Sequence, residues 1–254
     1  MTPILVICIL CVFAHFAKGV TGAASAIVFN AGLLTALALG LSGGLTLLDG
    51  LYWIALADLF ASAMLGVLLW RQLKVEKLAL LLLCGLVPIT VVFTLLLPHL
   101  DLGGLSLVLA LAVVGGGVYL AFRPDGKSAS ASAINRWALP TGLGAGVLNG
   151  LFGMGGPVIF ILLSRASDDP GMFRRRTVFI NIAAGLARVV TLAACGVFER
   201  KHFEWFGWAV PVMAAALLLG MWAHTKVKPR PFRVALGLLV MLAGIGGLLR
   251  FALG

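Results

Sequence analysis

Long apolar stretches follow one another from one end of the chain to the other, and short polar turns separate them. Because the apolar runs are continuous and do not alternate with polar positions, they predict helices and not strands. Most are about 18 residues or longer, which lets a helix cross a hydrocarbon core of about 30 Å. The apolar segments cover residues 3–39, 46–70, 78–97, 105–122, 137–164, 178–198, 206–223 and 234–251. The pattern predicts an all-α polytopic membrane protein.

The composition excludes a soluble domain. Of the 254 residues, 61% are hydrophobic and 11% are charged, and the mean hydropathy is +1.11. A soluble fold of this size cannot bury so much apolar surface. The net charge of +10 would indicate a nucleic-acid partner in a soluble protein, but here the basic residues lie mainly in short loops and set the orientation in the membrane. We therefore expect a lipid bilayer as partner and no nucleic acid.

Two of the apolar segments are too long for single spans and contain helix breakers. As one helix, residues 3–39 would measure about 55 Å and residues 137–164 about 42 Å. The first holds KGVTGAASAIV at 18–28 and the second holds NGLFGMGGPVI at 149–159. Non-helical backbone at membrane depth is tolerated only where protein or a water-filled cavity satisfies it. These two segments are predicted to be broken, re-entrant hairpins.

The two breaks begin two similar halves of the chain. Residues 1–122 form a first transmembrane repeat, residues 123–136 a polar cytoplasmic linker, and residues 137–254 a second repeat. The alignment pairs Gly19 with Gly150, Gly22 with Gly153, Asp58 with Asn181, and LVPI at 86–89 with AVPV at 209–212. Each half would hold one hairpin and three transmembrane helices, and an odd number of crossings inverts the second half relative to the first.

The distribution of basic residues favours this re-entrant arrangement. If all eight segments cross, nine basic residues lie on one side and eight on the other. If the first and fifth segments return to the side they came from, fourteen lie inside and three outside, with Lys18 and Arg188 left within the membrane. Only the second count satisfies the positive-inside rule. The hypothesis is therefore an inverted repeat with two hairpins.

The glycines and the proline in the two broken segments can form an anion-binding site. Gly and Pro leave free N–H groups at the N-terminus of a half-helix, where the helix dipole favours negative charge. Pro157 suits the first turn of such a half-helix. The alternative is tight helix packing, which we expect for Gly142 and Gly146 because they continue a four-residue spacing to Gly150.

Charged side chains within apolar segments point to the same regions. Such groups are costly unless they are paired or functional. Lys18, Arg188 and Asp58 could form a purely structural ion pair, or Lys18 and Arg188 could hold a small anion while Asp58 carries a coupling proton. His15 is either a proton relay or a packed, hydrogen-bonded histidine. The candidate substrate-binding residues are Lys18, Gly19, Thr21, Gly22, Ser25, Asn149, Gly153, Gly155, Gly156, Asn181 and Arg188, and the proton-coupling candidates are Asp58 and His15.

The two breaks, each near the start of a four-segment half, resemble those of the sulfite exporter TauE/SafE family of bacterial transporters. NGLFGMGGPVIFILLS at 149–164 resembles the family most closely, and RRRTVFINIAAGL at 174–186 follows its pattern. The first break departs from the family, since GVTGAASAIVFN carries alanine and serine where glycines are usual. The resemblance implies a multi-pass protein of the bacterial inner membrane. It also implies export of a sulfur oxyanion or organosulfonate, such as sulfite or sulfoacetate.

Other functions remain open at this stage. The chain could carry another small carboxylate or oxyanion, or act as a non-transporting membrane scaffold, although a scaffold leaves Lys18 and Arg188 unexplained. An intramembrane hydrolase would need a histidine beside a nucleophile, and the four histidines are scattered along the chain. We therefore expect no enzyme activity, no cofactor and no metal. The sequence leaves open the direction of transport, proton coupling and assembly into a homo-oligomer.

Overall fold

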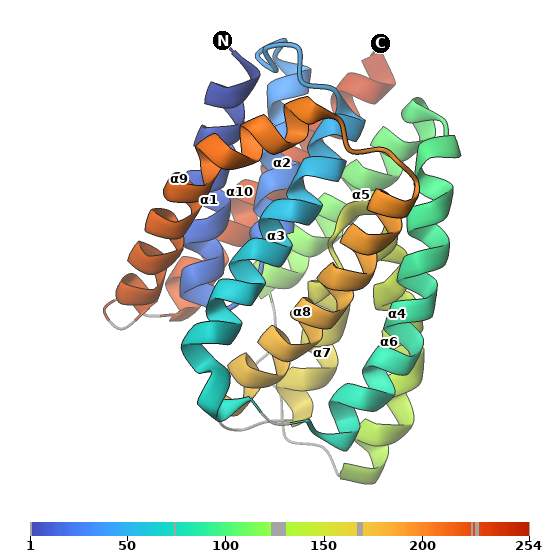
Figure 1. Ribbon diagram of the computed structural model, residues 1–254, viewed down its shortest axis with the longest axis vertical. Coiled ribbons are helices and arrows are strands. Elements are labelled where there is room, and N and C mark those ends of the chain that lie inside the picture. The colour runs from blue at the N-terminus through green and yellow to red at the C-terminus, as the bar shows by residue number, and fades with distance from the viewer. Residues whose placement is uncertain are drawn as a thin grey trace. The chain divides into compact units, whose positions relative to one another are not determined.

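A computed structural model describes residues 2–73, 75–122, 131–166, 170–224, 226 and 229–253. These residues form helices and connecting turns, and no strand occurs among them (Figure 1). The helices are α1 (Pro3–Thr21), α2 (Ser25–Ala38), α3 (Leu47–Leu69), η1 (Trp70–Gln72), α4 (Lys77–Leu96), η2 (Leu97–His99), α5 (Leu102–Phe122), α6 (Ala131–Phe152), α7 (Gly156–Ala166), α8 (Pro170–Ala194), α9 (Arg200–His224) and α10 (Pro229–Leu253). The all-α prediction is confirmed.

Six helices in the described part of the chain are long and apolar enough to cross a membrane. They are Pro3–Thr21, Leu47–Gln72, Lys77–His99, Leu102–Phe122, Gly171–Ala194 and Arg200–His224. Three apolar helical stretches are shorter, namely α2, α7 and the part of α10 from Val234 to Leu249. The protein is therefore a multi-pass membrane protein. Some helix boundaries differ from the prediction. Helix α6 begins inside the predicted linker 123–136, whose first eight residues lie outside the described residues. Helix α8 begins at Pro170 and α9 at Arg200, several residues before the apolar segments predicted for them.

The chain divides into two compact units that cut across the predicted halves. Unit 1 contains residues 1–57, 98–123 and 198–254, and unit 2 contains residues 58–97 and 124–197. Unit 1 thus combines α1, α2 and α5 with α9 and α10, whereas unit 2 combines α4 with α6, α7 and α8. Each unit draws helices from both halves of the sequence. The two repeats and their inversion remain predictions.

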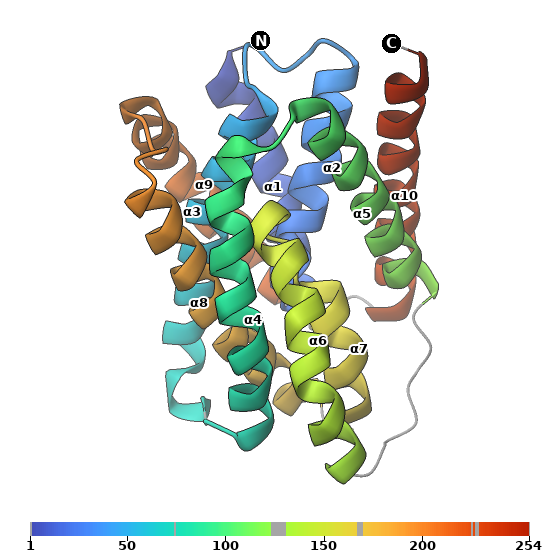
Figure 2. The ribbon, with the colours of Figure 1, turned by 90° about the vertical axis from the view of Figure 1, so that its right-hand side faces the viewer.

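In unit 1 the first broken segment folds as a helical hairpin. After the break, α2 turns back along α1, and the two helices pack against each other (Figure 2). The outer side of α1 packs along α9, and α2 packs on α10 and α5. Gly19 allows the close approach of α1 to α9, since a Cβ at this position would collide with the Leu217 carbonyl and lie 2.8 Å from the Gly220 Cα.

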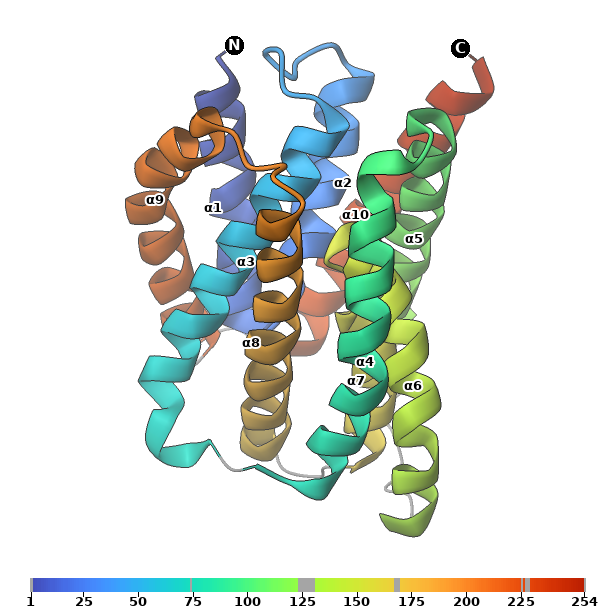
Figure 3. The same cartoon turned by 45° about the vertical axis from the view of Figure 1, so that its right-hand side comes forward.

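The second broken segment makes a similar hairpin in unit 2. Here α6 packs along α4, and α7 turns back against α6 (Figure 3). A Cβ on Gly146 would lie 2.7 Å from the Ile89 Cβ, and one on Gly150 would lie 2.7 Å from the Phe93 Cβ. One on Gly142 would collide with the backbone of α4. The prediction that this four-residue glycine spacing serves helix packing is confirmed.

Candidate functional site

The break in unit 1 begins where α1 ends in a left-handed glycine. Gly22 has a φ of 82°, and its N–H donates to the Lys18 carbonyl at 2.7 Å, which caps the helix. Glycine suits this conformation because it has no Cβ to collide with the backbone. Two residues later Ala24 also adopts a positive φ, 75°, and α2 begins at Ser25. Among the described residues Ala24 is the one non-glycine with a positive φ.

The Thr21 hydroxyl holds this turn together. It accepts a hydrogen bond from the Ala23 N–H at 3.2 Å, and it lies 2.6 Å from the Ala23 carbonyl and 2.8 Å from the Ala17 carbonyl. Since a hydroxyl has a single hydrogen, it donates to one of these carbonyls at a time. The bonding capacity of Thr21 is therefore largely used by its own chain, as is common for threonine near helix ends.

Lys18 and His15 occupy the last two turns of α1 and are both buried. The Lys18 side chain is 1% exposed, although it carries an ammonium group. The His15 Nδ1 lies 3.1 Å from the Cys11 carbonyl, and its Nε2 lies 3.4 Å from the Ala57 carbonyl in α3. A neutral ring donates to one of these carbonyls, and only a protonated ring donates to both. The structure thus places His15 as a packed, hydrogen-bonded histidine, and a proton-relay role stays a prediction.

The break in unit 2 repeats the cap of the first break at the aligned positions. Gly153 has a φ of 72°, and its N–H donates to the Asn149 carbonyl at 2.9 Å. Gly153 and Asn149 align with Gly22 and Lys18. The turn then differs, because the Met154 N–H donates to the Leu148 carbonyl at 3.1 Å and not to a side chain. The same local chain reversal is therefore stabilised by a threonine in unit 1 and by backbone in unit 2.

The start of α7 presents backbone donors that the chain does not use. The N–H groups of Gly155 and Gly156 make no hydrogen bond with the described residues, and Pro157 has no N–H. At 11 residues, α7 is about 17 Å long, roughly half of a hydrocarbon core of about 30 Å. If the C-terminal end of α7, at Ala166, lies at the membrane surface, its N-terminal end lies near the middle of the membrane.

Arg188 brings a positive charge to this same break. It lies on α8, is 2% exposed, and donates through Nη2 to the Leu151 carbonyl at 3.2 Å. Leu151 lies two residues before Gly153. Asp58, at the start of the part of α3 that belongs to unit 2, interacts electrostatically with Arg188. The structure thus brings Arg188 to the second break and Asp58 within electrostatic range of Arg188, which spacing along the chain does not reveal.

Two threonines of α4 that the sequence analysis missed hold the end of α6. The Asn149 amide donates to the Thr90 hydroxyl at 3.2 Å, and the Thr94 hydroxyl donates to the Gly150 carbonyl at 3.2 Å. Both threonines are fully buried. The signal was present as two threonines one turn apart in ITVVFT, within an otherwise apolar helix.

Three candidates remain, namely Ser25 and Gly155 at the two breaks and Asn181 on α8. Ser25 is buried at the first turn of α2. Gly155 is packed, since a Cβ there would lie 3.0 Å from the Ala145 carbonyl. Asn181 is half-buried on α8 and makes no side-chain hydrogen bond with the described residues. Within the described part of the chain, no group of three or more His, Cys, Asp or Glu side chains could hold a metal ion.

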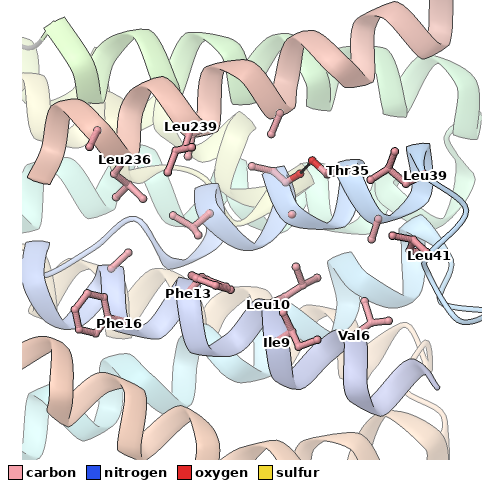
Figure 4. A pocket seen from close by; sticks show the side chains of 18 of the residues that line it. Val6, Ile9, Leu10, Phe13, Phe16, Thr35, Leu39, Leu41, Leu236 and Leu239 are labelled. Carbon is pink, nitrogen blue, oxygen red and sulfur yellow. Dashed lines mark hydrogen bonds between the residues drawn. The ribbon is translucent and has the colours of Figure 1, made fainter. Parts of the chain in front are cut away.

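A separate cavity in unit 1 has the wrong chemistry for an anion. It has a volume of about 650 Å³ and lies between α1, α2 and α10 (Figure 4). Thr35 supplies the one polar side chain of its lining, and the Thr35 hydroxyl already donates to the Ala31 carbonyl at 2.9 Å. An anion there would lose its hydration without gaining hydrogen bonds. This cavity therefore does not suit an anion.

Comparison with known proteins agrees with this arrangement. A model of the family described as sulfite exporter TauE/SafE matches residues 7–246 of the 254-residue chain. No curated protein and no solved structure matches the chain significantly. The matched region includes both chain breaks together with Lys18, Asp58 and Arg188. Because the match covers nearly the whole chain, the protein belongs to the sulfite exporter TauE/SafE family.

Proposed function

We propose that this protein exports a small sulfur oxyanion or organosulfonate, such as sulfite or sulfoacetate, across the bacterial inner membrane. Its family is one of membrane exporters, and the proposal adds the anion-binding groups. The observation that carries it is the pairing of a buried basic side chain with each chain break. Lys18 belongs to the first break and Arg188 reaches the second.

In unit 2 we assign the anion to Arg188 and the start of α7. The guanidinium is planar and can hold two oxygens of a sulfite or sulfonate group at once. The unused N–H groups of Gly155 and Gly156 lie at a helix N-terminus, which favours negative charge. Asn149 and Asn181 supply further amide donors near this break and on α8. The Arg188–Leu151 hydrogen bond supports the assignment, because it holds the guanidinium at the break.

In unit 1 we assign anion binding to Lys18 and to the first turn of α2, which includes Ser25. A lysine side chain that is 1% exposed is costly in an apolar helix, and anion binding would offset that cost during transport. Gly19, Thr21 and Gly22 contribute by shaping this break. Gly19 does so by close packing on α9, and Thr21 and Gly22 do so by fixing the turn.

Asp58 is the proposed carrier of a coupling proton. Its electrostatic interaction with Arg188 links the two groups. An anion bound at Arg188 would compete with Asp58 for the guanidinium, so the two groups would act together during transport.

Efflux from proteoliposomes loaded with labelled sulfite or sulfoacetate tests the proposal. Arg188→Ala and Lys18→Ala each remove a buried positive charge, and the loss of its contact with the anion should lower efflux at least about thirtyfold. Arg200→Ala is the matched control, because its side chain is 93% exposed and pairs with Glu204 on the same helix face. Wild-type flux in both buried-charge variants would remove the site assignment. Absence of flux for every sulfur anion in the wild type would contradict the function.

A further inference from the structure

One face of α8 carries polar side chains through an otherwise apolar helix. At about 100° per residue, positions 177, 181, 184 and 188 fall within about 60° of one another. They hold Thr177, Asn181, Ala184 and Arg188. On the opposite face, Leu186 is 52% exposed and Val190 58% exposed, which suits lipid contact. The exposed residues Leu186 and Val190 therefore lie on the apolar side of α8, and the buried Thr177 and Arg188 lie on its polar face.

Thr177 differs from the other threonine of this helix in how its hydroxyl is used. The Thr191 hydroxyl donates to the Ala187 carbonyl at 2.7 Å, the usual bond of a threonine to its own helix. The Thr177 side chain is 0% exposed, and its hydroxyl has no hydrogen-bond partner among the described residues. A buried polar group without a partner destabilises the fold, so its retention calls for a ligand.

We propose that the Thr177 hydroxyl donates a hydrogen bond to the transported anion, and that the face formed by Thr177, Asn181 and Arg188 is its path through unit 2. This inference rests on the proposed function and extends it to a residue outside the chain breaks. The substrate class is the same small sulfur oxyanion or organosulfonate.

The spacing and chemistry of this face suit passage and not permanent binding. Thr177 and Asn181 are about 6 Å apart along the helix axis, and Asn181 and Arg188 are about 10 Å apart. Thr177 and Asn181 are neutral donors, which satisfy an anion's oxygens but hold it less tightly than a charged group. Transport requires binding that is strong enough to admit the ion and weak enough to release it. The arginines at 174–176, at the start of α8, raise the local concentration of anions.

The first test compares two threonine substitutions in the proteoliposome efflux assay with sulfite and with sulfoacetate. Thr177→Val keeps the shape of the side chain and removes the hydroxyl, so kcat/KM falls about tenfold or more. Thr191→Val is the matched control, since its hydroxyl is already used by the helix, and its flux stays at the wild-type level. Thr177→Ser restores the hydroxyl and the flux. Wild-type kcat/KM in Thr177→Val would overturn the inference.

A second test does not depend on the activity of Thr177→Val. Thr177→Cys and Ile180→Cys are made in a background without the native cysteines and treated with the anionic reagent 2-sulfonatoethyl methanethiosulfonate. Both positions are 0% exposed, but Ile180 lies in the apolar core with Leu82 and Leu86. The reagent is expected to modify position 177 and to leave position 180 unmodified, and sulfoacetate slows the reaction. Equal reactivity at both positions, or none at 177, overturns the inference.

The wild type and Arg188→Ala distinguish a failure of the proposed function from a failure of the inference about Thr177. If the wild type carries no sulfur anion, the proposed function fails and this inference fails with it. If the wild type is active, Arg188→Ala is inactive and Thr177→Val transports normally, only the inference about Thr177 is wrong.

Discussion

The contact between α4 and α6 can be tested with a single methyl group at Gly150. A Cβ at this position would lie 2.7 Å from the Phe93 Cβ and 2.8 Å from the Thr90 carbonyl. The Thr90 carbonyl belongs to the backbone, so it cannot move without displacing α4. The Gly150 carbonyl also accepts the Thr94 hydroxyl, and this bond would lengthen as the helices separate. Gly150→Ala should therefore loosen the packing that positions the second break.

The magnitude follows from two opposing terms. Overpacking a well-packed contact costs about 1–3 kcal/mol, and the higher helix propensity of alanine returns up to about 1 kcal/mol. With the midpoint of the first term, about 2 kcal/mol, the net loss in the free energy of unfolding is about 1–2 kcal/mol. For a protein of this size, that corresponds to a fall in Tm of about 2–8 °C.

Thermal unfolding of purified protein in detergent measures this effect, and Gly144→Ala is the control. Gly144 lies on the same helix, so it gains the same propensity term, but a Cβ there would meet only the Val158 Cγ1 at 3.9 Å. That is ordinary van der Waals contact, and the Tm of Gly144→Ala should equal or exceed that of the wild type. If Gly150→Ala is as stable as Gly144→Ala, the close approach of α4 and α6 is refuted.

Two further substitutions test the first break and an ion pair of unit 2. Ala24→Gly relieves a left-handed conformation that costs a non-glycine residue about 1–2 kcal/mol, so its Tm should rise by a few degrees, whereas Ala23→Gly, without a positive φ, should not raise it. Glu76→Gln removes the negative charge that pairs with Arg176, whose Nε donates to Glu76 at 2.7 Å, and should cost about 1 kcal/mol, less at high salt. Glu204→Gln, in the exposed Arg200–Glu204 pair, should leave Tm unchanged. A lower Tm for Ala24→Gly, or equal effects of the two glutamate changes, would contradict these assignments.

Several elements of the fold could be read directly from the residues. The eight apolar segments match the observed helices, and the two overlong ones are broken where glycines interrupt them. Gly22 and Gly153 occupy the same left-handed cap, so the alignment of the two breaks located the chain reversals correctly. Helix propensity, hydropathy and the need for a left-handed residue depend on a few neighbouring positions, so they are visible in sequence.

In the first break, alanine and serine stand where the family usually has glycines, and the structure shows how the turn forms without them. Ala24 takes a positive φ without being glycine, and the Thr21 hydroxyl bonds the Ala23 N–H. In the second break, the Leu148 carbonyl accepts the corresponding N–H of Met154. The alanine-rich break therefore makes the same reversal by other means. The Thr21 hydrogen bond depends on side-chain geometry, which an alignment of the two sequence segments does not reveal.

The candidate site was only partly foreseeable. Lys18, Asp58 and Arg188 stand out in the chain because charges are rare in apolar segments. The approach of Arg188 to the second break cannot be seen in the same way, because the Leu151 carbonyl that it contacts lies 37 residues away in the sequence. Thr90 and Thr94 support the end of α6 from more than 50 residues away. Their spacing of one turn is visible in the sequence, but it does not show that they bond α6 and not their own helix.

Hydropathy and glycine placement were enough to establish a helical membrane protein with two broken segments. The choice of helix partners came from packing, which joined α1 to α9 and α6 to α4 across the two halves of the chain. Lipid is as apolar as the helix surfaces, so partners in a membrane are selected by close backbone contact and hydrogen bonds and not by hydrophobicity. Those contacts join residues far apart in sequence, and they exist only once the helices have assembled.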